Sequence, residues 1–135
     1  MLRGALTLAL LATAPAAAAQ FPSEGDRWQL DVRASGPTGS ARFARVVAEP
    51  THGLRWAIDV TCGLVDLRTG RETVEVHGDG FAARDRWGTL GGTFVTPGRP
   101  TSGFAVDQLG EELDGPPVHF GPGCPSGLGS LSSGD

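Results

Sequence analysis

The chain is 135 residues long, enough for one domain, and carries eleven basic and fifteen acidic residues for a net charge of −4. The basic residues are all arginine and are spread along the chain without forming a cluster. Because nucleic acids and anionic lipid surfaces both select clustered positive charge, the composition argues against either as a partner. The chain has no Lys, Asn or Tyr, a bias typical of a GC-rich bacterial genome.

Residues 1–19 have the layout of a secretory signal peptide. A single positive charge at Arg3 precedes an apolar stretch over 5–12, and small residues follow at 17–19. This order predicts cleavage after residue 19 and a mature chain that begins at Gln20.

A membrane anchor is the alternative interpretation of the same segment. Spanning a bilayer takes about 20 consecutive apolar residues, and Thr7, Thr13 and Pro15 interrupt the stretch before that length. There is no twin-arginine pair and no cysteine at the cleavage point to accept a lipid. We therefore expect an exported protein, periplasmic or extracellular, with no membrane span.

After the signal, glycine and proline punctuate short segments rich in Val, Phe, Trp, Leu and Thr. No segment repeats apolar residues at helical spacing for long enough to predict a helix, so the pattern is typical of an all-β domain. The clearest predicted strands cover residues 27–34, 41–48, 54–62, 88–96 and 101–109. The residue pattern of segment 78–88 does not predict a particular secondary structure.

The segment 54–62 alternates most regularly, and the apolar phase changes directly after it. The alternation places one set of side chains on a single face: Leu54, Trp56, Ile58, Val60 and Cys62. A glycine at the phase change, Gly63, predicts a β-bulge. Residues 68–71 then predict a two-residue hairpin turn with positive φ at Gly70, which would set Val65 opposite Val74.

Seven or eight short strands predict an antiparallel sandwich or a small closed barrel, and the sequence alone does not choose between them. The predicted β domain covers residues 20–120. Residues 121–135 are rich in Gly and Ser and predict an extended tail that is mobile beyond Cys124.

The two cysteines, Cys62 and Cys124, predict one disulfide bond, because exported bacterial proteins fold in an oxidising compartment. The bond would close a loop of about 60 residues and stabilise the fold by about 4 kcal/mol. A catalytic thiol is the alternative, and it would need a base such as His77 placed across from Cys62. Neither cysteine lies in a hydrolase signature or a Cys-x-x-Cys motif.

Other chemistry-bearing residues do not form a convincing site. His77, Asp79 and His119 are weak candidates for metal ligands, and the simpler interpretation is that Glu75, His77 and Asp79 form an exposed polar strand face. Glu111, Glu112 and Asp114 resemble paired carboxylates but lie in an acidic loop. No nucleophile elbow, phosphate-binding loop or dinucleotide motif occurs. We therefore predict no catalytic residues, no metal and no cofactor.

Tryptophan gives the strongest hint of a binding surface. Trp28 and Trp56 share the apolar phase of their predicted strands and are expected in the core. Trp87 lies between charged residues and glycines and is expected to be exposed, flanked by Arg84 and Arg86. Such a group suits contact with a sugar or with a partner's surface.

The segment "GDRW", which ends at Trp28 ahead of a predicted strand meander and a disulfide to the C-terminal tail, is loosely similar to lipocalins. That family has Gly-x-Trp at this place, one residue shorter, and a helix after the last strand, for which no helical segment is found here. The resemblance implies an apolar ligand inside a barrel, lined by residues such as Phe43, Trp56 and Phe104.

These observations favour a non-catalytic exported β domain of the bacterial envelope that binds a protein or surface partner. A small barrel that carries an apolar molecule is the first alternative. A hydrolase or metal protein whose site the sequence does not reveal is the second. The identity of the partner and the oligomeric state stay open.

Overall fold

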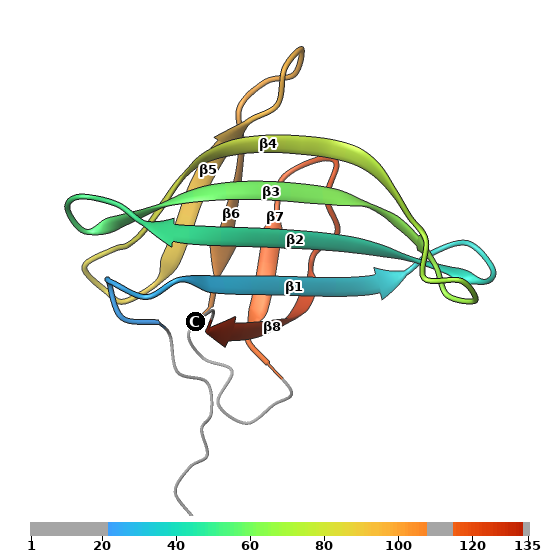
Figure 1. The fold of residues 1–135 in the computed structure, drawn as a ribbon, viewed down its shortest axis with the longest axis horizontal. Helices are drawn as coiled ribbons and strands as arrows, with labels where there is room; N and C mark the ends of the chain where they lie inside the picture. The colour runs from blue at the N-terminus through green and yellow to red at the C-terminus, as the bar shows by residue number, and fades with distance from the viewer. Residues whose placement is uncertain (1–21, 108–114, 134–135) are drawn as a thin grey trace, which may run out of the picture.

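The computed structural model describes residues 22–107 and 115–133, which form one closed antiparallel barrel (Figure 1). Each strand pairs with its neighbours in sequence, and β8 pairs with β1 to close the barrel. The strands are β1 Trp28–Ser35, β2 Ser40–Pro50, β3 Arg55–Asp66, β4 Glu72–Arg84, β5 Leu90–Val95, β6 Ser102–Val106, β7 Pro117–Phe120 and β8 Gly127–Ser133.

The all-β prediction is confirmed, and the architecture is the barrel, not the sandwich. The predicted signal peptide, residues 1–19, lies outside the described residues. Within those residues no helix has the length and hydropathy that crossing a membrane requires.

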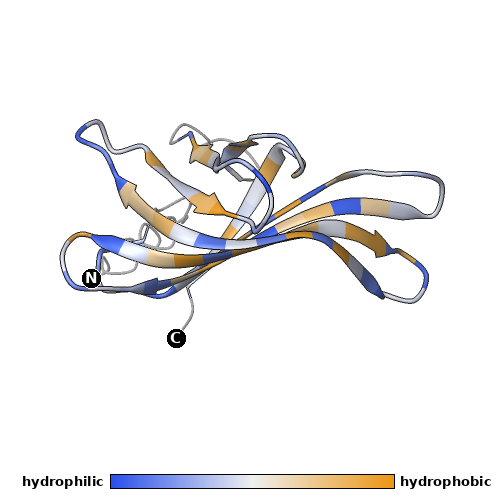
Figure 2. Ribbon diagram, turned by 90° about the horizontal axis from the view of Figure 1, so that it is seen from above, coloured by the Kyte–Doolittle hydropathy of each residue, from blue (hydrophilic) through white to orange (hydrophobic). Residues whose placement is uncertain are grey.

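The barrel interior is filled by side chains from alternate positions of the strands, and the same alternation of apolar and polar residues is visible along the long strands in Figure 2. At one end the rings of Trp28 and Trp56 meet edge to face with centroids 5.6 Å apart. The indole N–H of Trp56 donates a hydrogen bond to the backbone oxygen of Asp26 at 2.8 Å. Both tryptophans are 1% exposed, as predicted for core residues.

β8 closes the barrel from within the predicted tail. Residues 127–133 form a strand in which Gly129 pairs with Val32 of β1 and Ser133 pairs with Trp28. A Cβ at Gly129 would lie only 2.7 Å from a methyl group of Val118 and 2.9 Å from one of Leu30. The Gly- and Ser-rich composition of residues 127–133 predicts a mobile tail, but in the structure these small residues allow β8 to pack closely against its neighbours in the barrel.

β3 and β4 change register between Cys62 and Gly63, where the bulge is predicted, but the extra residue is Glu75 on β4, because Cys62 pairs with Val76 and Gly63 with Val74. The predicted pairing of Val65 with Val74 is wrong, because Val65 pairs with Glu72 and Val74 pairs with Gly63. β3 continues to residue 66, and a longer loop over 67–71 replaces the two-residue turn. Gly70 does have positive φ there, 79°.

The unassigned segment 78–88 forms the second half of β4 and the turn after it. β4 arches over the barrel (Figure 1), and glycines let β5 approach it closely. A Cβ at Gly80 would lie 2.0 Å from the backbone oxygen of Thr93. Glycine is therefore required at this position for the sheet to curl into a barrel.

The disulfide predicted between Cys62 and Cys124 is present, with the two Cα atoms 5.5 Å apart. Cys62 lies in the barrel core, and Cys124 lies in the loop between β7 and β8. The bond therefore ties this loop to β3, and both sulfurs are part of the architecture.

Candidate functional site

The turn between β4 and β5, residues 85–89, presents Trp87 to solvent. Its side chain is 70% exposed, although Trp28 and Trp56 are fully buried. The turn lies at the left end of the barrel in Figure 1, next to the turn between β2 and β3.

Hydrogen bonds to Asp85 fix the shape of this turn. Its Oδ1 accepts from the backbone N–H of Trp87 at 2.8 Å and from that of Thr89 at 2.9 Å. The backbone oxygen of Asp85 accepts from the N–H of Gly88, whose φ is 89°. A partner would therefore meet Trp87 on a turn that is already ordered, which lowers the entropy lost on binding.

The two arginines that flank Trp87 in sequence lie in different surroundings. The guanidinium of Arg86 lies 4.9 Å from the centre of the Trp87 ring, in cation–π geometry. The guanidinium of Arg84 is partly buried and donates a hydrogen bond to the backbone oxygen of Pro22. Arg86 therefore shares the exposed surface with Trp87, and Arg84 anchors the segment ahead of β1.

Three more exposed residues lie at the same end of the barrel as the Trp87 turn. Leu54 is 70% exposed in the turn before β3, so its predicted place on the buried strand face is wrong. The guanidinium of Arg55 lies 4.3 Å from the ring centre of Phe81, which is 47% exposed on β4. We call Leu54, Arg55, Phe81, Arg86 and Trp87 the end-loop surface.

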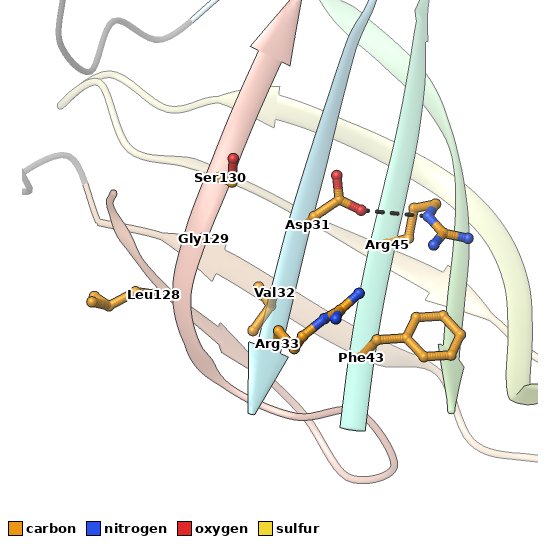
Figure 3. A pocket seen from close by; sticks show the side chains of 8 residues that line it. All are labelled: Asp31, Val32, Arg33, Phe43, Arg45, Leu128, Gly129 and Ser130. Atoms are coloured by element: carbon orange, nitrogen blue, oxygen red, sulfur yellow. Dashed lines mark hydrogen bonds and ion pairs between the residues drawn. The ribbon is translucent and has the colours of Figure 1, made fainter. Parts of the chain in front are cut away.

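A hollow of about 390 Å³ lies on the outer face of β8, β1 and β2 (Figure 3). Its lining includes Asp31, Arg33, Phe43, Arg45, Leu128 and Ser130. Phe43 is 2% exposed and packs with Ala41 and Val65 in a small cluster separate from the barrel core. Of the three residues predicted to line a ligand cavity, Trp56 and Phe104 lie in the barrel core, and Phe43 lies outside it.

Ion pairs hold the wall of this outer hollow. Arg45 covers the Phe43 ring and donates two hydrogen bonds to the Glu72 carboxylate, the shorter at 2.7 Å. It also reaches Asp31 at 3.4 Å. The hydrogen bonds from Arg45 lower the pKa of Glu72, and its bonds to Glu72 raise the pKa of Arg45. The arrangement braces β2 against β4, and Arg45 is fully engaged in it.

The lowered pKa of Glu72 predicts a pH-dependent part of the stability. In the unfolded chain the Glu72 side chain has a pKa near 4.3. The contribution of the ion pair to the free energy of unfolding is therefore complete above that pH, and it is lost as the pH falls through the lower pKa of the folded state. Both side chains are about one-third exposed, so we expect an effect of about 1 kcal/mol or less. Glu72→Gln should remove it.

Urea unfolding of both proteins at pH 6 and pH 3 measures this effect. The wild type should lose more stability than Glu72→Gln over that interval. Glu49→Gln serves as a matched control, because Glu49 and Arg27 form an ion pair that is more than half exposed. The loss of stability of this variant between pH 6 and pH 3 should equal that of the wild type. Equal losses for the wild type and Glu72→Gln would contradict the role of this pair.

The weak metal candidates do not converge. The ring of His77 lies 3.1 Å from the carboxylate of Asp59 on β3, and Asp79 lies two residues further along β4. His119 is on β7, and its ring lies 3.8 Å from the carboxylate of Asp107. Among the described residues no group of three or more potential ligands is close enough to hold a metal ion.

The remaining chemical candidates give no site in this part of the chain. Cys62 pairs with Val76, and His77 pairs with Thr61. Both cysteines are oxidised, so neither is a free nucleophile. The carboxylates Glu111, Glu112 and Asp114 lie outside the described residues.

Comparison of the chain with protein-family models, curated proteins and solved structures gave no match. Any functional statement therefore depends on the surfaces described above.

Proposed function

We propose that this protein is a non-catalytic binding domain of the bacterial envelope, and that the end-loop surface contacts a protein partner. The observation that carries the proposal is Trp87, a large aromatic side chain held 70% exposed on an ordered turn. Tryptophan and arginine are enriched among the residues that contribute most to protein interfaces.

The rest of the molecule supports a scaffold role. The barrel interior is occupied by packed side chains, so a large partner would bind to the outside. Export is supported by the predicted signal peptide and by the disulfide, since disulfides persist in oxidising compartments. Three exposed apolar side chains, those of Leu54, Phe81 and Trp87, come from the end of the barrel that carries the 85–89 turn, and exposed apolar groups of this kind are available for an interaction surface.

Photo-crosslinking in the producing bacterium tests this proposal. A photoreactive phenylalanine analogue replaces Leu54, which is 70% exposed in the turn before β3, at the same end of the barrel as Trp87. The matched control replaces Leu67, which is 55% exposed in the turn between β3 and β4 at the other end of the barrel. The position-54 variant should give a discrete product with another protein, and the position-67 variant should not.

The same crosslinking in a Trp87→Ala background shows whether Trp87 matters. We expect the position-54 product to decrease strongly. A product that persists without Trp87, that forms equally from position 67, or that consists of two copies of this chain would overturn the proposal.

A further inference from the structure

A pocket of about 140 Å³ lies at the other end of the barrel. It is formed between the turn over residues 96–101, which joins β5 to β6, and the loop over 121–126, which joins β7 to β8. The length of β5 separates it from the turn that carries Trp87. The pocket is therefore distinct from the end-loop surface.

The base of this pocket is apolar and belongs to the barrel core. Val76 and Phe94 line it, and they are only 4% and 1% exposed. Pro100 and Pro122 add apolar walls from the two loops. Pro122 is two residues from Cys124, so the disulfide holds its loop in place and the wall is largely formed before any ligand arrives.

Two polar residues, the exposed Arg99 and the half-buried Ser102, also line the pocket. The side chain of Arg99 lies along its lining, and a guanidinium nitrogen comes within 3.5 Å of the position a Cβ would take at Gly123. In the described parts of the chain this guanidinium has no hydrogen bond or ion pair. The buried hydroxyl of Ser102, which also lines the pocket, has no hydrogen-bond partner either.

From this combination we infer that the pocket binds a small carboxylic acid with a ring-sized apolar body. The apolar body lies against Val76, Phe94 and the two prolines, and the carboxylate pairs with Arg99. A guanidinium matches a carboxylate with two parallel hydrogen bonds, which an alcohol or an amide does not reproduce.

The volume limits the size of this ligand. An apolar protein cavity of roughly 150 Å³ accommodates one benzene ring. The pocket therefore suits a single six-membered ring, and a two-ring body would extend into solvent. Small-molecule sites occur in the mouths of β-barrels, and this one differs from the central ligand cavity that the sequence resemblance implied.

Titration of the full mature protein with benzoate, followed by backbone amide NMR, tests the inference. Benzyl alcohol serves as the neutral probe of equal ring size. We expect saturable benzoate shifts confined to Val76 and its neighbours on β4, residues 94–102 and residues 121–124, and weaker binding of benzyl alcohol. Shifts that do not saturate, or that map to the outer hollow around Arg33, would overturn the assignment.

Two arginine variants separate carboxylate recognition from general charge effects. Arg99→Ala should weaken benzoate binding about tenfold, because a hydrogen-bonded charge pair is lost, and should leave benzyl alcohol binding unchanged. Arg68→Ala removes an exposed arginine from the loop between β3 and β4 and should bind benzoate like the wild type. Equal weakening by both variants would contradict a specific role for Arg99.

The outcome is independent of the partner proposal. Trp87 lies at the far end of β5 from the pocket, so the Trp87→Ala variant should bind benzoate like the wild type. Loss of benzoate binding in that variant would contradict the placement of the site.

Discussion

Removal of the Cys62–Cys124 disulfide is expected to lower the free energy of unfolding by about 4 kcal/mol. The bond joins residues 62 apart in sequence, and opening a loop of this length restores chain entropy of about that size to the unfolded state. Small domains are stable by only about 5 to 15 kcal/mol, so the reduced protein should be close to unfolding at 37 °C. Urea unfolding of oxidised and reduced wild type gives the difference directly.

A double variant, Cys62→Ala with Cys124→Ala, controls for the chemistry of free thiols. Cys62 is fully buried, so the variant should be somewhat less stable than the reduced wild type through lost packing. An oxidised and a reduced protein with the same unfolding midpoint would show that the bond contributes nothing to stability.

The second large effect is expected at Trp56. Trp56→Ala should lower the free energy of unfolding by about 3 to 5 kcal/mol, because it leaves a cavity where a fully buried ring meets Trp28 edge to face. Chemical denaturation monitored by circular dichroism measures the change.

Trp56→Phe separates packing from hydrogen bonding at the same site. This variant keeps an aromatic ring in the core but loses the N–H that donates to the Asp26 oxygen. Its free energy of unfolding should fall by about 1 kcal/mol for the lost hydrogen bond, plus the packing lost because the phenyl ring is smaller. If Trp56→Ala proved no more destabilising than Trp56→Phe, the ring would not be part of a close-packed core.

Alternation along single strands was enough to predict much of the core. Trp56, Ile58, Val60 and Cys62 all face the interior as the two-residue period requires. The position of the register change could also be located, because the apolar phase changes at Gly63, but the extra residue lies on the partner strand β4. The choice of barrel over sandwich depends on how distant strands pair, which no local pattern encodes.

For β8, the strand that closes the barrel, the composition of the sequence predicts the opposite of what the structure shows. Residues 127–133 are all Gly, Ser or Leu, and that composition is typical of a mobile tail. Their function in the fold depends on close contact with Leu30 and Val118, which only the three-dimensional arrangement reveals.

Only part of the end-loop surface could be predicted from the sequence. Trp87 stands out because glycines and charges surround it and no strand phase includes it. Leu54 fits the period of the strand that follows it, so alternation assigned it to the core, but β3 begins one residue later. Phe81 and Arg55 come together across β3 and β4, and their pairing depends on a register that the sequence left undetermined.

The affinity of the crosslinked partner for the purified protein tests the binding account most directly. Calorimetric titration should show that Trp87→Ala binds at least about tenfold more weakly than the wild type, since exposed tryptophans at interfaces commonly contribute more than 1 kcal/mol. Leu67→Ala, at the other end of the barrel, should bind within about twofold of the wild type. Equal affinities for the wild type and Trp87→Ala would contradict the account.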